Sequence, residues 1–181
     1  MLPALHIFDQ ALVVAFAALA LLAALSDWSR FIIPNRISLG VAGLWALHAL
    51  LLMAQGHSPV FILWSVGVAL VVFLIGFAMF AARLLGGGDV KFMAAAALWA
   101  GPEFVLPFIV IVTVCGALLG LAFLVPGLGN RPEDDPADGV PADPAAGGVI
   151  AAGRLGRKMP YGLAIALGSV AVTFHLLSAG G

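Results

Sequence analysis

The stretch Gly86-Gly87-Gly88-Asp89-Val90-Lys91 lies near the middle of the chain and places two opposite charges directly after three glycines. Apart from Arg83, the residues on either side of it are almost all apolar. A charged side chain at the centre of a bilayer costs about 2.5–3.5 kcal/mol on insertion scales. A charge in such surroundings is expected to serve a function, so the first question is which residue Asp89 works with.

The composition of the chain is that of an integral membrane protein. Of its 181 residues, 63% are hydrophobic and 9% are charged, whereas soluble chains have about 45–50% apolar and about 25% charged residues. The net charge of −1 indicates nothing about partners, because in membrane proteins the placement of charge matters more than its sum. We therefore expect an all-α membrane protein that forms a single polytopic domain over residues 1–181.

Apolar runs predict about six transmembrane helices, since a span needs about 20 apolar residues. We place them at residues 5–25, 37–53, 60–82, 89–100, 104–125 and 160–177. The fourth run measures only about 18 Å at 1.5 Å per residue, which is shorter than a hydrocarbon core of about 30 Å. The first eight residues lack a basic region, so the first span is expected to stay in the membrane and not to be cleaved.

The basic residues predict the topology. If the short fourth run crosses the membrane, all eight Lys and Arg residues lie on one side, as the positive-inside rule favours. Both termini would then be periplasmic. The region at about 126–158, rich in Pro, Gly and Ala, is expected to be a flexible cytosolic loop. Its acidic residues within 131–143 fit either a solvated linker or an acidic surface that recruits a partner.

Two acidic residues outside that loop are expected at similar depth on the cytosolic side, where helix packing can bring them together, either in the free enzyme or only when substrate is bound. Asp27 closes the first span and Asp89 opens the fourth, whereas Asp9 and Glu103 fall at the outer ends. Two adjacent carboxylates cannot both ionise cheaply, and such a pair suits a water molecule that one carboxylate deprotonates while the other polarises a carbonyl. For Asp27 alone, a helix cap or an interfacial charge is the better interpretation. For Asp89 it is weaker, because the preceding glycines make room for a ligand.

Two further polar residues allow more than one interpretation. Lys91 either sets the charge of Asp89 or orients its loop, or it is a snorkelling interfacial lysine. His48 lies about 18 Å along its helix from Arg36, which is too deep to meet the aspartates. We interpret it as a histidine within the membrane that has a polar partner.

Three motifs resemble those of the type IV prepilin peptidases. Asp27 with the following Ile33-Pro34-Asn35 resembles their first aspartate motif, and residues 86–91 match the second, Gly-x-Gly-Asp-x-Lys. Lys158-Met159-Pro160-Tyr161-Gly162 resembles the Pro-Tyr-Gly stretch that opens their last helix. The motifs occur in the family's order across six predicted spans, so the resemblance covers nearly the whole chain.

The resemblance implies an aspartic endopeptidase of the bacterial inner membrane, with a bundle of the Gly-x-Gly-Asp type. Asp27 and Asp89 would be catalytic, supported by Gly86, Gly88 and Lys91, without a metal or cofactor. The enzyme would remove a basic leader from prepilins at the cytosolic face, before a hydrophobic helix. Its partners would be this precursor and membrane lipid, and no nucleic acid.

The layout resembles the small members that serve Flp-type (tight adherence) pili, and archaeal preflagellin peptidases share the chemistry. Larger members carry a cysteine-bearing cytosolic domain between the first two spans and also N-methylate the pilin. Here only about ten residues, 27–36, occupy that place. We therefore expect neither methyl transfer nor S-adenosylmethionine binding.

Two other classes of protein fit the same aspartates. An ion-coupled transporter or channel would use Asp27 and Asp89 as ion or proton sites, although such sites usually lie near the midplane and not at one face. In a structural or assembly subunit, both aspartates would only anchor helices.

Overall fold

Five helices form the described part of the chain, which comprises residues 3–30, 32–124 and 161–179 of the computed structural model. They are α1 (Pro3–Arg30), α2 (Asn35–Ala54), α3 (Pro59–Ala81), α4 (Gly87–Leu124) and α6 (Tyr161–Ala179). Each is long and apolar enough to cross a membrane. The expectation of an all-α membrane protein is thus confirmed, and the predicted loop at 126–158 lies outside the described residues.

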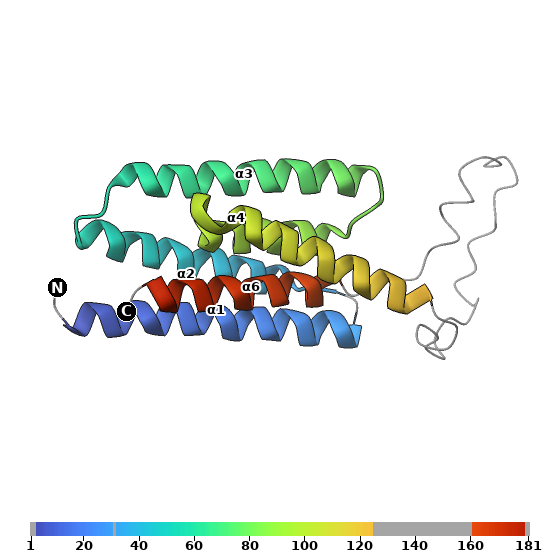
Figure 1. Cartoon of the computed structure of the whole chain (residues 1–181), viewed down its shortest axis with the longest axis horizontal. Helices are drawn as coiled ribbons and strands as arrows, with labels where there is room; N and C mark the ends of the chain where they lie inside the picture. Colours follow the sequence, from blue (N-terminus) through green and yellow to red (C-terminus); the bar gives the residue numbers. More distant parts are fainter. Residues whose placement is uncertain (1–2, 31, 125–160, 180–181) are drawn as a thin grey trace, which may run out of the picture.

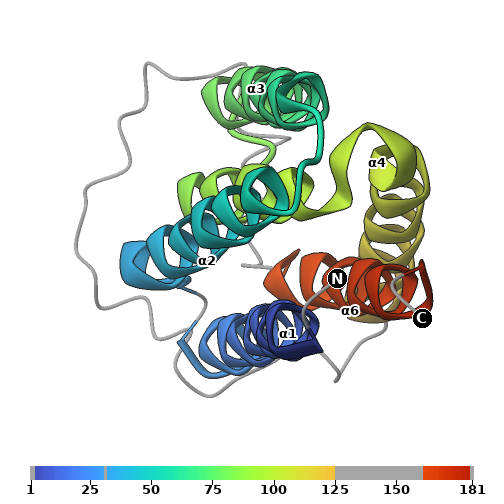
Figure 2. The same ribbon diagram turned by 90° about the vertical axis from the view of Figure 1, so that its left-hand side faces the viewer.

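The helices form a bundle with α1 and α3 on opposite sides and the other three between them (Figures 1 and 2). Helix α3 packs on α4, α4 packs on α2 and α6, and α1 packs on α2 and α6. The start of α1 and the end of α6 lie at the same end of the bundle (Figure 1). The end of α1 and the start of α4 lie at the other end.

Helix α4 is divided at Gly101, where the backbone has φ 58° and ψ −173°. Pro102 follows, and a proline disfavours helical backbone at the residue before it. Figure 1 shows the chain reversing direction at this break, so residues 87–100 run away from the end that holds Asp89 and residues 102–124 return towards it. The six expected spans therefore correspond to five helices, the fourth of which has two parts.

Gly101→Ala is expected to lower the free energy of unfolding by about 1–3 kcal/mol, because almost only glycine adopts this combination of φ and ψ. An added Cβ would also lie 3.3 Å from the Ser65 hydroxyl oxygen. The matched control is Gly67→Ala in α3, where a Cβ meets nothing within 4 Å. Thermal unfolding in detergent measures the difference, and equal stability of the two variants would contradict the expectation.

Helix α1 is longer than the sequence predicted. We expected it to stop near Leu25, at the first polar residues, but it continues to Arg30. The Ser29 hydroxyl donates to the Leu25 carbonyl at 2.8 Å, so this polar side chain is satisfied within the helix and does not end it. Asp27 consequently lies in the last turn of α1 and projects from a regular helix.

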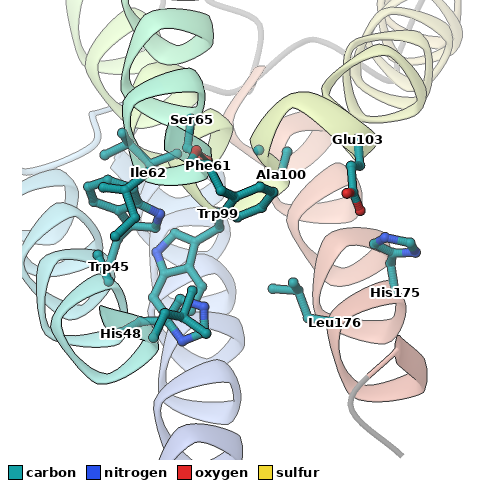
Figure 3. Close-up of a pocket in the computed structure, with 14 residues that line it drawn as sticks. Trp45, His48, Phe61, Ile62, Ser65, Trp99, Ala100, Glu103, His175 and Leu176 are labelled. Atoms are coloured by element: carbon teal, nitrogen blue, oxygen red, sulfur yellow. Dashed lines mark hydrogen bonds between the residues drawn. The ribbon is translucent and has the colours of Figure 1, made fainter. Parts of the chain in front are cut away.

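A buried polar cluster lies at the opposite end of the bundle. His48 Nδ1 and Asp9 Oδ1 are 2.6 Å apart, which confirms the prediction that His48 has a polar partner. The Trp99 ring stacks on His48 at 5.0 Å and on Phe16 at 4.7 Å. Figure 3 shows His48 and Trp99 beside a cavity of about 50 Å³. This volume suits a few water molecules at most.

His48→Leu is expected to destabilise the fold by about 1–3 kcal/mol, since it leaves the half-buried Asp9 carboxylate without its partner. The double variant with Asp9→Leu should regain part of that loss, because neither polar group then remains. Thermal unfolding in detergent tests both variants. A double variant as unstable as the sum of the two single variants would exclude the coupling.

Candidate active site

One cavity of about 440 Å³ contains both aspartates that the sequence singled out. It lies where α1 ends and where α2 and α4 begin. Its lining consists of Asp27, residues 32–35 and residues 86–89. Two carboxylates more than sixty positions apart in the sequence therefore line one cavity at one end of the bundle, which agrees with their similar predicted depth.

Asp27 is held by the first turn of α6. Its side chain is buried, with 4% of the residue exposed, and its Oδ2 accepts a hydrogen bond from the Gly162 backbone N–H at 2.7 Å. The first N–H groups of a helix have no acceptor within the helix, and the helix dipole favours a negative charge there. The sequence favoured a helix cap or an interfacial charge for Asp27 alone, and in the structure its carboxylate lies at the N-terminus of α6 and not at that of its own helix.

Gly162 has to be glycine for this contact to form. A Cβ at this position would lie 2.8 Å from Asp27 Cβ, 2.8 Å from Asp27 Oδ2 and 2.9 Å from Ile33 Cδ1. All three distances are shorter than any ordinary packing contact. The absence of a side chain is what lets the backbone of α6 reach the carboxylate.

Asp89 is the third residue of α4, and its carboxylate accepts a hydrogen bond from the Gly86 backbone N–H. This is the side-chain half of a capping box, in which the third helical residue reaches back to the residue before the helix. The half-buried carboxylate also lies close enough to Asp27 for the two charges to repel each other. Asp89 thus caps its helix and lines the cavity at the same time.

Two of the three glycines serve the packing of the protein itself. A Cβ on Gly88 would lie 3.3 Å from the Ile33 carbonyl oxygen, and one on Gly87 would lie 3.3 Å from the Phe80 ring. Residues 86–88 do not have the positive φ that favours glycine. Our expectation that the glycines make room for a ligand is therefore incomplete, because two of them let α4 approach α3 and the α1–α2 connection.

Lys91 is exposed, and its Nζ donates to Asn35 Oδ1 at 3.1 Å. It forms no ion pair with Asp89 in the described part of the chain. Direct neutralisation of Asp89 is thus not its role in this geometry. The contact joins the first turn of α2 to the second turn of α4, which agrees with the orienting role considered from the sequence.

Sequence reasoning missed what Gly162 and Asn35 do. Both residues belonged to the motifs that carry the resemblance, so the motifs indicated where to look. The Gly162 contact uses a backbone N–H, which every residue but proline has, and no residue type marks it. The Asn35 contact depends on how α2 and α4 are rotated relative to each other.

A family model described as the type IV leader peptidase family matches residues 14–121 of the chain. A search of curated proteins and a search of solved structures gave no significant match. The matched region is more than half of the chain and includes Asp27 and Asp89, but not α6. The bundle is thus that of a membrane-embedded peptidase, a hydrolase. The chain belongs to the type IV leader peptidase family, as the three motifs indicated.

Proposed function

We propose that this peptidase is an aspartic endopeptidase in which Asp27 and Asp89 activate a water molecule. Its substrates are prepilin-like precursors of the Flp type, from which it removes a basic leader at the cytosolic face of the bacterial inner membrane. One observation carries the proposal: two carboxylates from different helices line one cavity. A lone structural aspartate needs no second carboxylate beside it, whereas aspartic-protease chemistry uses two carboxylates that share one proton.

The chemistry requires the pair to hold one proton between them, because two adjacent carboxylates do not both ionise cheaply. The ionised carboxylate takes a proton from water as the water oxygen attacks the peptide carbonyl carbon. The protonated carboxyl donates its proton to the carbonyl oxygen. Collapse of the tetrahedral gem-diol breaks the C–N bond. The carboxyl that took the proton from water passes it to the departing amine, and a gem-diol hydroxyl returns a proton to the other carboxylate, so the pair again holds one proton. We assign acid and base to the pair and not to either residue.

The hydrogen bonds described above support the proposal, because each holds one of the two carboxylates in place. Gly162 N–H orients the Asp27 carboxylate, and Gly86 N–H orients that of Asp89. Holding reacting groups in place supplies a large part of a catalysed rate. Neither donor is a side chain that could titrate, so the orientation does not depend on a further protonation step.

The placement of basic residues supports the cytosolic orientation. Arg30 ends α1, Arg36 lies in the first turn of α2, Arg83 follows α3 and Lys91 lies in the second turn of α4. All of the Lys and Arg residues in the described part of the chain thus lie at the end that carries the aspartates. Loops rich in Lys and Arg stay in the cytosol.

The proposal is tested with the full chain reconstituted in vesicles and a precursor that carries a Lys-rich leader, a glycine and an apolar segment of about 20 residues. We expect mass spectrometry to show one new product that lacks the leader. An ion-coupled transporter would instead leave the precursor intact and move protons or cations across the vesicle membrane. That second result would overturn the proposal.

A further inference from the structure

An apolar groove of about 560 Å³ adjoins the carboxylate cavity and opens between α2 and α3. The two helices are joined by a short turn, yet they do not pack closely on each other, since α3 packs on α4. The first part of α4 forms the floor of the groove through Ala94 and Ala95. Small side chains at a helix surface let another helix approach closely.

The residues that line the groove form three stripes, one on each of α2, α3 and α4, and the spacing within each stripe is that of one helix face. On α3 it consists of Val66, Ala69, Leu70 and Phe73, which is the i, i+3, i+4, i+7 pattern of one helix face. The stripes on α2 and α4 repeat that spacing and begin at Asn35 and Lys91. Seven residues of helix rise about 10 Å, so the groove matches about two turns of an added helix.

Two observations indicate what occupies this groove. Asn35 lines both the groove and the carboxylate cavity, so the groove and the proposed site adjoin at this residue. The Ser38 hydroxyl, one turn further along α2, is buried with 6% of the residue exposed and has no hydrogen-bond partner among the described residues. A buried polar group without a partner is costly, and the hydrocarbon tail of a lipid offers it none.

We propose that this groove receives the apolar segment of the substrate that follows the cleaved bond, bound as a helix. A peptide backbone in lipid must satisfy its own polar groups, which favours a helix. The first four N–H groups of such a helix have no internal acceptor, and the Ser38 hydroxyl oxygen accepts one of them. The inference rests on the proposed peptidase function and adds that the enzyme recognises a membrane-spanning segment beside the bond it cuts.

Cysteine cross-linking tests the occupant. The full chain carries Asp89→Asn, so that the precursor stays uncut, and Cys115→Ser, so that one introduced cysteine remains. Leu70→Cys faces the groove, and Val71→Cys is the matched control, because both residues are 55% exposed on α3 and only Leu70 lines the groove. The precursor carries a single cysteine one or two turns beyond the cleavage site.

We expect a disulfide with Leu70→Cys and little with Val71→Cys. Equal cross-linking at both positions, or none at either, overturns the inference, and the second result is the one expected if lipid alone fills the groove. Cleavage of the precursor by the unmodified enzyme tests the peptidase proposal separately from the groove assignment. If that enzyme cuts the precursor but Leu70→Cys shows no preference, the peptidase proposal stands and the groove assignment fails.

Kinetic variants give a second, independent measurement. Ala94→Phe fills the floor of the groove and should raise KM for the precursor about tenfold. Ser38→Ala should raise it about fivefold, the usual effect of one hydrogen bond. Ala78→Phe on the exposed face of α3, outside the groove, is the control and should leave KM unchanged. Unchanged KM in both groove variants contradicts the assignment.

Discussion

Asp27→Asn and Asp89→Asn are each expected to lower the rate of leader removal by about 10²–10⁴-fold, the usual contribution of general acid–base catalysis. An amide has nearly the size of the carboxyl, but it neither takes a proton from water nor passes one to a carbonyl oxygen. Each substitution therefore removes one half of the pair. The measurement is the initial rate of cleavage in vesicles, followed by the shift of the precursor on a gel.

The control for this pair is Glu103→Gln, which makes the same chemical change at an exposed position after the α4 break. It should cleave at the wild-type rate. Circular dichroism of each variant in detergent checks that the helices remain. If either Asp variant processes the precursor as fast as the unmodified enzyme, that aspartate is not catalytic and the paired mechanism is wrong.

Gly162→Ala is expected to lower the cleavage rate about 100-fold, although Gly162 carries no reacting group. The added Cβ would lie 2.8 Å from Asp27 Oδ2, so either the carboxylate or the start of α6 has to move. A displacement of about 1 Å at a reacting group is enough for an effect of this size. The variant should show a lower kcat with little change in KM, because the groove beyond Asn35 is untouched.

The matched control is Gly43→Ala in α2, where a Cβ meets nothing within 4 Å. That variant should retain wild-type activity and gain slightly in stability, since alanine favours helix more than glycine does. Normal cleavage by Gly162→Ala would mean that the contact with Asp27 has no part in positioning the carboxylate. A loss of activity in both variants would point to a general effect of helix substitutions.

Hydropathy was sufficient to predict the helices, because a membrane span has to be long and apolar whatever it packs against. Hydropathy placed the end of α1 too early, near Leu25, because the residues that follow include the polar Ser26 and Ser29. Their hydroxyls bond to the carbonyls of Ile32 and Leu25. A side chain that bonds to nearby backbone carbonyls is no longer a reason for the helix to stop.

The candidate site was predictable in part, for a different reason. The charges of Asp27 and Asp89 are conspicuous in an apolar chain, and topology alone brings them to one end. The hydrogen bond from Gly162 and the groove between α2 and α3 depend on tertiary packing, which no local pattern encodes. A short turn between two helices usually predicts that they are packed neighbours, and here α4 lies against α3 instead.

The stack of Phe16 on Trp99 has a consequence for the distance between the two carboxylates. Asp27 lies eleven residues beyond Phe16 on α1, about 16 Å along the axis, and Asp89 lies ten residues before Trp99 on α4, about 15 Å. Both rings are buried, with 0% and 3% of the residues exposed. Two helices joined in register at such a depth do not slide past each other without separating the rings. The spacing of the carboxylates along the bundle is thereby set in the interior of the protein as well as by the connections that line the cavity.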